Sequence, residues 1–289
     1  MKKVLILSLA LILLLGVAAN GTFGLFSDAE TSTGNTFTAW VEEVVCAKFN
    51  VSDDKDIKIY KYDASGNLVG SFDLATVHPY HNAKPSGVAS VGDYVYVLDQ
   101  ASKQVYQYTC SGTLVDVSKK LLKAAGSSVG NIDGLAINGT DMWVLSGNDK
   151  NIYQYPLGTV FPDGGTLTAT VEIALDNDNK GAVGLAIDST YLYVVDYATS
   201  SKETRFYQYR RSDGALTAVS KVLLEKTPNN NKLQSPAGAM FDGTSLWVVD
   251  SGTNKVYEYD KDAPFLGSGS INAISEFALD GNNTDATGV

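Results

Sequence analysis

The chain has 289 residues, of which 44% are hydrophobic and 19% are charged, with 27 glycines and 7 prolines. This balance is that of a globular protein and excludes a disordered or collagen-like chain. The formal net charge of −10 opposes attraction to phosphate backbones, so nucleic acid is excluded as a partner.

The N-terminus has the layout of a secretory signal. A Lys2-Lys3 pair precedes an unbroken apolar run at residues 4–19, which is the order of charged and hydrophobic regions in a signal peptide. At about 1.5 Å per helical residue this run falls short of a ~30 Å hydrocarbon core. We therefore predict a signal peptide at residues 1–25, contact with a membrane only through it, and a secreted, extracellular or cell-surface protein. The alternative is an uncleaved anchor extended through Phe26.

The adjoining segment NGTFGLFSDAETSTGNTFTA, at residues 20–39, resembles the SipW-dependent type of signal on TasA-like and camelysin-like surface proteins of bacteria and archaea. The resemblance implies cleavage just before the Phe-Ser-Asp element at 26–28 and export to the cell surface or matrix. Residues 26–48 would then form a linker or strand. The resemblance ends near residue 39, where WVEE replaces the strand usual in that family.

A short aromatic signature recurs five times in the rest of the chain, at spacings of 46, 47, 54 and 50 residues. The copies are KIYKYD (58–63), QVYQYT (104–109), NIYQYP (151–156), RFYQYR (205–210) and KVYEYD (255–260). A strand-like run ending in Asp or Ser precedes each copy, a Gly-apolar run precedes that run in four copies, and a fourth run follows each signature. Four strands per repeated unit predict an all-β fold, a β-propeller with five four-stranded antiparallel blades.

The repeats resemble NHL-like propeller repeats over residues 49–289, and this resemblance implies the fold without implying an activity. The chain enters the first unit at its second strand and ends in DATGV, which matches the start of an inner strand. We therefore expect the N- and C-terminal strands to close the ring within one blade, with residues 36–45 as the alternative donor. The stretch 116–126 alone is typical of an amphipathic helix, but its counterparts in other units favour the strand that we predict.

Four aspartates occupy one repeat position, which Ser146 occupies in the third unit; they are Asp53, Asp99, Asp196 and Asp250. A ring of carboxylates supplies the oxygen ligands that Ca²⁺ prefers, so the four are candidate metal ligands. The preferred interpretation is that each caps the turn after it, because every blade needs a fold-determining turn whereas a binding site is needed once. On that interpretation the protein has no cofactor.

The only two histidines lie between the first two units, in ATVHPYHNAK at residues 75–84. His78 and His81, with Tyr80 between them, are candidate ligand-binding residues because imidazole titrates near neutral pH. Tyr197 joins them because it lies in the insert YATSSKET, and variable loops on a constant frame are where specificity resides.

The remaining candidates have structural roles. Cys46 and Cys110 fall at non-equivalent places in the repeat, so we expect two unpaired thiols, with a disulfide as the alternative that export would permit. Aromatic residues at fixed strand positions, among them Trp143 and Trp247, are expected to fill space between blades.

The sequence contains no His-Glu-x-x-His or phosphate-loop motif, the signatures of two common classes of catalytic site. We therefore expect a non-catalytic, surface- or matrix-associated module that binds or scaffolds an extracellular protein or glycan. One alternative is a metal-dependent lyase or lactonase-like propeller enzyme that uses the aspartate series. The other is a TasA-like fibre subunit whose N-terminal segment enters a neighbour's blade.

Overall fold

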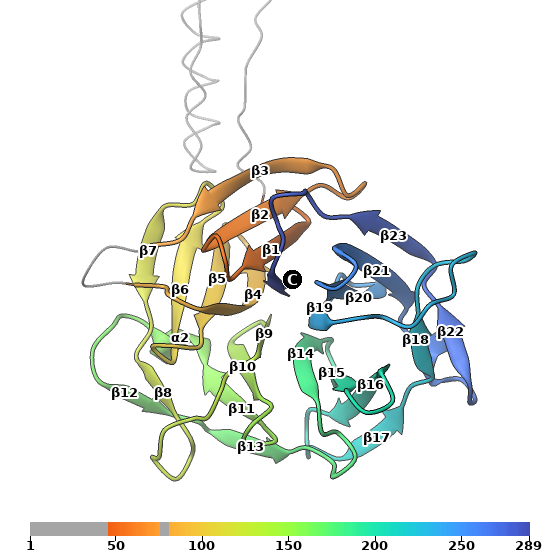
Figure 1. The fold of residues 1–289 in the computed structure, drawn as a ribbon. Helices are drawn as coiled ribbons and strands as arrows, with labels where there is room; N and C mark the ends of the chain where they lie inside the picture. Colours follow the sequence, from red (N-terminus) through yellow and green to blue (C-terminus); the bar gives the residue numbers. More distant parts are fainter. Residues whose placement is uncertain (1–45, 76–80) are drawn as a thin grey trace, which may run out of the picture. The chain divides into compact units, whose positions relative to one another are not determined.

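The computed structural model describes residues 46–75 and 81–289. The signal peptide, its cleavage site, the segment 36–45, His78 and Tyr80 lie outside the described residues. Five four-stranded antiparallel sheets surround a central axis and form a five-bladed β-propeller (Figure 1). The predicted fold class and blade count are confirmed.

The strands run outward from the axis in chain order in every blade except blade 1, whose innermost strand is the last of the chain. Blade 1 contains β24 (Ala286–Gly288), β1 (Phe49–Asp53), β2 (Lys58–Tyr62) and β3 (Leu68–Asp73). Blade 2 contains β4 (Pro85–Val91), β5 (Tyr94–Asp99), β6 (Gln104–Thr109) and β7 (Leu114–Val117). Blade 3 contains β9 (Gly134–Asn138), β10 (Asp141–Ser146), β11 (Asn151–Pro156) and β13 (Val171–Ala174). Blade 4 contains β14 (Ala182–Ile187), β15 (Tyr191–Ala198), β16 (Glu203–Arg210) and β17 (Leu216–Val219). Blade 5 contains β19 (Pro236–Phe241), β20 (Ser245–Asp250), β21 (Lys255–Asp260) and β23 (Ser275–Ala278).

The helical elements among the described residues are the single turns α2 (Leu157–Val160) and η1 (Ala263–Phe265). Neither is long and apolar enough to cross a membrane.

The ring closes as the repeat pattern predicts. Strand β24 pairs antiparallel with β1, with Ser52 opposite Gly288 and Asp53 opposite Ala286. The C-terminus therefore lies at the centre of the ring beside the first described strand (Figure 1). Blade 1 thereby has four strands from its own chain, which protects an edge that would otherwise be open.

Five glycines allow the inner strands to meet at the axis: Gly87, Gly134, Gly184, Gly238 and Gly288. A Cβ on Gly134 would lie 2.9 Å from the Leu185 nitrogen, and one on Gly238 would lie 2.7 Å from the Gly288 Cα. Each glycine meets the inner strand of the following blade in this way, and Gly288 meets Gly87 to complete the circle. The absence of side chains thus sets the close spacing of the blades.

Four of the five predicted fourth runs are each divided into two strands, and the run of blade 1 forms the single strand β3. The prediction of one strand at 116–126 is wrong. That stretch contains the end of β7 and then a separate strand, β8 (Lys120–Leu122), which pairs in parallel with β12 (Thr166–Thr168) of the next unit. Strands β18 (Val222–Leu224) and β22 (Ser270–Asn272) repeat this arrangement between blades 4 and 5.

A serine between the two halves explains the break. Ser118 Oγ accepts the Val105 N–H at 2.7 Å and donates to the Lys119 carbonyl at 2.8 Å. Ser220 makes the equivalent bonds in blade 4, at 2.8 Å each. Because the side chain supplies the acceptor that a continuing strand would supply, the backbone is free to leave the blade.

Hydrogen bonds from the second tyrosine of each signature join neighbouring blades. Tyr108 of blade 2 accepts the Ala75 N–H after the outer strand of blade 1, at 2.9 Å, and Tyr155 of blade 3 donates to the Leu122 carbonyl after β8 at 3.0 Å. The other three bonds join Tyr62 to Asp280, Tyr209 to Asp176 and Tyr259 to Leu224, at 2.9–3.0 Å. Burial raises the pKa of Tyr108 to about 12, so the phenol stays neutral.

The aromatic positions on the second strands also pack between blades, as predicted. Trp143 is 2% exposed and Trp247 is 4% exposed. Each belongs to a hydrophobic cluster that combines residues of two adjacent blades.

Candidate functional site

The aspartate series lies at one end of the ring, which we call the Asp face. Inner strands start at this end, because Pro85 pairs with Asp99 and Pro236 pairs with Asp250. All four aspartates are at most 3% exposed. This face also carries the connections between blades and the turns after the second strands.

Each aspartate bonds backbone N–H groups. Asp99 accepts the Lys84 N–H at 2.7 Å and the Ser102 N–H at 2.8 Å, so it ties the start of its inner strand to the turn after its second strand. Asp53 makes the corresponding pair of bonds to Asp285 and Asp56, at 3.0 and 2.8 Å.

The other two blades with this aspartate use it similarly. Asp250 accepts from Gln234, Ser235 and Gly252 at 2.7–2.9 Å. Asp196 accepts the Gly181 N–H at 2.6 Å, and burial raises the pKa of its carboxyl. These carboxylates therefore act as latches that satisfy buried backbone donors, a role that explains why the position repeats.

Blade 3 keeps a latch although Ser146 replaces the aspartate. Asp149 accepts the Gly130 N–H at 2.7 Å and pairs with Lys123 Nζ at 2.8 Å. Asp133, just before β9, accepts the N–H of Gly147, just after β10, at 2.8 Å. In blade 3 the carboxylates therefore come from other sequence positions than in the other blades, but they make the same kind of bond to backbone N–H groups.

The structure brings the four aspartates to one face but does not bring them together around a point. Among residues 46–75 and 81–289 there is no group of three or more His, Cys, Asp or Glu side chains that could hold a metal ion. Calcium needs several oxygen ligands converging at 2.3–2.6 Å.

The predicted ligand-binding residues that the structure describes lie on different blades. His81 is an exposed residue of the connection between blades 1 and 2. Tyr197 lies near the end of β15 in blade 4, half-buried, with its N–H donating to the Gly181 carbonyl at 2.8 Å. No hydrogen bond joins His81 to Tyr197 within the described part of the chain.

A central cavity opens at the other end of the ring, which we call the cavity face. Its volume is about 130 Å³, and the later halves of the inner strands line it, at 88–90, 135–137, 185–187 and 239–241, together with Val289. The glycines that meet at the axis lie closer to the Asp face, where the strands leave no room for water. The cavity therefore opens at the cavity face, and most of the side chains that line it are aliphatic.

Asn50 is one of the polar residues in this lining. It is 3% exposed, and its Nδ2 donates to the Ala47 carbonyl at 3.2 Å and to Ser90 Oγ at 2.8 Å. These two bonds fix the orientation of the amide. Its Oδ1 is buried and has no hydrogen-bond partner among the described residues.

Lys48 lines the cavity, and its Nζ lies 2.8 Å from Asp242 Oδ2. The ammonium group also lies 5.5 Å from the centre of the Phe49 ring and 5.6 Å from that of Trp247. Burial alone would raise the pKa of Asp242, but hydrogen bonds, the largest from Lys48, outweigh it and hold this pKa well below its usual range.

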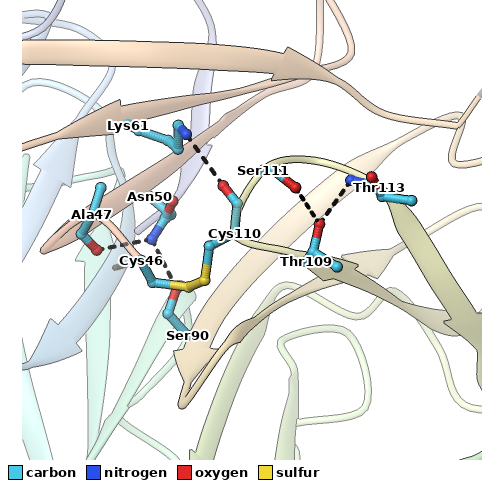
Figure 2. Close-up of a disulfide and its surroundings, with 9 residues drawn as sticks. All are labelled: Cys46, Ala47, Asn50, Lys61, Ser90, Thr109, Cys110, Ser111 and Thr113. Carbon is cyan, nitrogen blue, oxygen red and sulfur yellow. Dashed lines mark hydrogen bonds between the residues drawn. A yellow bond between two sulfur atoms is a disulfide. The ribbon is translucent and has the colours of Figure 1, made fainter. Parts of the chain in front are cut away.

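A disulfide anchors the residues just before β1, which lie beside the axial cavity. Cys46 and Cys110 are bonded, with their Cα atoms 4.9 Å apart, so the expectation of two free thiols is wrong. Figure 2 shows Lys61 Nζ donating to the Cys110 carbonyl beside this bond. Non-equivalent repeat positions become neighbours because Cys46 precedes the first blade and lies outside the repeat.

Comparisons with known proteins support the fold. No protein-family model matches the chain, and no curated protein matches it. A structure of the nidogen/laminin complex superposes with a TM-score of 0.50 and 13% identity, covering 83% of this chain and 95% of that one. Two enzymes superpose less well. A virginiamycin B lyase from Staphylococcus aureus has a TM-score of 0.41, 14% identity and coverage of 81% and 67%. A glutaminyl cyclase from Myxococcus xanthus has a TM-score of 0.45, 13% identity and coverage of 65% and 70%. The chain has a β-propeller fold, and at these identities the likeness carries nothing about activity.

Proposed function

We propose that this protein is an exported, surface- or matrix-associated module that binds an extracellular protein without catalysing a reaction. The observation that carries the proposal is the axial cavity, which is lined mostly by aliphatic side chains and contains one buried acceptor, Asn50 Oδ1, that has no donor among the described residues. A volume of about 130 Å³ suits one aliphatic side chain, and a neighbouring peptide N–H would satisfy the acceptor.

Export is supported by two features of the chain. Cys46 and Cys110 form a disulfide. Disulfides persist in oxidising compartments and are rare in cytosolic proteins. The apolar run at 4–19 after two lysines has the layout of a secretory signal. Both features support a ligand outside the cell.

Small molecules that carry one apolar side chain and a peptide N–H test the proposal. Ligand-observed NMR would use N-acetyl amides of Val, Leu and Ile beside neutral monosaccharides. We expect the capped amino acids to bind and the sugars not to bind. A Ser90→Trp variant closes the mouth of the cavity and should abolish binding. Its control is Ser71→Trp, an exposed position on β3, which should bind normally.

Two results would contradict the proposal. Binding that survives Ser90→Trp would place the site elsewhere. Chemical turnover of a bound compound would favour the metal-dependent enzyme. The fibre alternative has a separate requirement, since an incoming strand would have to displace β24 from a blade that is already complete.

A further inference from the structure

A second cavity, of about 430 Å³, opens at the cavity face between blades 3 and 4. Trp143 and Gln154 line it from blade 3, and Arg210 and Arg211 line it from the end of β16 and the turn that follows in blade 4. The chain has only three arginines among its 22 basic residues. Two of the three arginines therefore line one cavity.

Two buried donors at this cavity have no acceptor within the described ranges. Trp143 is 2% exposed, and its indole Nε1 has no partner. The guanidinium of Arg211 lies 5.9 Å from the Trp143 ring centre, and its Nε is also buried without a partner. Indole N–H and arginine Nε–H can only donate. A ligand that satisfies both must present acceptor oxygens.

The equivalent positions in blades 4 and 5 show which acceptor is missing. In blade 5, Asp242 Oδ2 accepts from the Trp247 indole at 2.9 Å and pairs with Lys48 at 2.8 Å. In blade 4, Asp188 Oδ2 accepts from the Tyr193 hydroxyl at 2.8 Å and lies 3.9 Å from Lys261 Nζ. Each of these blades thus combines a carboxylate, an aromatic donor and a cation supplied from the following blade.

Blade 3 has the aromatic donor and the cation but not the carboxylate. Asn138 occupies the position of Asp188 and Asp242, and its Nδ2 donates to the Asp188 carbonyl at 2.9 Å. Arg211 Nη1 bonds the Asp188 and Ser189 carbonyls at 3.3 and 3.0 Å.

The nearest carboxylate to Arg211 does not replace the missing one. Asp141 Oδ2 lies 3.6 Å from Arg211 Nη2, and it accepts no hydrogen bond from Arg211 Nε or from the Trp143 indole. Arg210 is paired with Asp213 at 2.8 Å, in an exposed pair. Arg211 Nε and the Trp143 indole therefore both lack an acceptor among the described residues.

We infer that this cavity binds the carboxylate of a sugar acid such as a uronate. The carboxylate would complete in blade 3 the arrangement that Asp188 and Asp242 complete in blades 4 and 5. Hydroxyls of Ser189, Thr190 and Ser212 line the same cavity and match sugar hydroxyls, whereas a simple anion would leave them unused. The site is separate from the axial cavity, so it stands whether or not the proposed protein ligand is correct.

The three tryptophan indoles provide a direct test. The purified mature protein would be labelled with ¹⁵N-tryptophan and titrated with sodium D-glucuronate, glucose, acetate and inorganic phosphate. We expect a saturable shift of the Trp143 indole N–H peak with glucuronate alone, with the Trp247 peak unmoved. Trp143→Phe assigns the peak, and the Trp247 peak reports whether each variant is folded.

Matched variants locate the site. Arg211→Gln should weaken glucuronate binding about tenfold or more, as loss of a charge-assisted hydrogen bond does. Asn138→Asp supplies the missing carboxylate internally, so it should shift the Trp143 peak without ligand and weaken binding to a similar extent. Arg205→Gln removes the third arginine, which lies outside the cavity, and should change nothing. Ser90→Trp should also leave glucuronate binding intact.

Several outcomes would overturn the inference. No shift of the Trp143 peak, or binding that persists in Arg211→Gln, would remove the site. Equal binding of acetate would show that the sugar is not recognised, and tighter binding of phosphate would show that the site does not select a carboxylate.

Discussion

Asp242 shows how one carboxylate can organise several residues at the cavity face. Its side chain is 5% exposed and accepts hydrogen bonds from Lys48, Thr244, Ser245 and Trp247 at 2.8–2.9 Å. Burial opposes ionisation, yet these donors more than compensate for it, and the pKa of Asp242 lies well below its ordinary value. The ionised form therefore stabilises the folded state.

This arrangement predicts a pH-dependent effect of Asp242→Asn. The unfolded carboxyl titrates at about 3.9, and the folded pKa is lower, so the stabilisation is present above about pH 4 and is lost as the pH falls further. The variant should therefore be less stable than the wild type at pH 7, and the difference should shrink below about pH 4. Urea unfolding across this pH range measures it.

The control for this prediction is Asp73→Asn, which breaks an ion pair whose carboxylate is 78% exposed. Surface pairs of this kind contribute little, so the variant should unfold like the wild type at every pH. A difference between Asp242→Asn and the wild type that stays constant to pH 2 would contradict the role of ionisation.

At the scale of residues, the sequence identifies the repeated aspartates but not the donors they satisfy. The preference for turn caps over a metal ring agrees with the hydrogen bonds of Asp99 and Asp250. The move of the latch to Asp149 in blade 3 could not be predicted, because it depends on which backbone N–H groups lie within reach. Asn138 and the scarcity of arginine were visible in the sequence, yet only the fold shows that they meet at one cavity.

Among the elements, the inner strands were predicted well and the outer strands poorly. Inner strands are fixed by a Gly-apolar pattern that recurs in every unit. The outer runs of blades 2 and 4 are divided by Ser118 and Ser220. The second half of each pairs with the first half of the outer run in the following blade. A Val-Ser-Lys sequence marks both breaks, but a serine in a strand-like run has no fixed meaning until its partner strand is known.

The close packing of inner strands predicts that Gly134→Ala is strongly destabilising. The added Cβ would lie 2.9 Å from the Leu185 nitrogen, and this backbone cannot move without displacing the next blade. We expect a loss of about 2–4 kcal/mol in the free energy of unfolding, measured by urea denaturation. Gly158→Ala, in α2, meets nothing within 4 Å and should be neutral or slightly stabilising. Equal effects of the two substitutions would show that the inner strands can separate.

At the scale of the whole ring, β24 closes the circle and the disulfide adds a second connection between blades 1 and 2. Strand β24 supplies the innermost strand of blade 1, and the disulfide joins the residues before blade 1 to the end of β6 in blade 2. The first connection is made of backbone hydrogen bonds and packing, so it can open and reclose. The second is covalent, and it restricts the unfolded chain over a separation of 64 residues.

The disulfide should therefore contribute stability without being needed for the fold. Replacing both cysteines with serine should lower the free energy of unfolding by about 2–4 kcal/mol and the melting temperature by roughly 5–15 °C. A reductant should lower the melting temperature of the wild type by the same amount and should leave that of the double variant unchanged. The reduced protein should retain its blades, because β24 still pairs with β1 and the tyrosine hydrogen bonds still join neighbouring sheets. Two results together would show that the bond does not form: the reductant leaves the melting temperature of the wild type unchanged, and both thiols react freely in the native protein. That result would also remove one of the two supports for export.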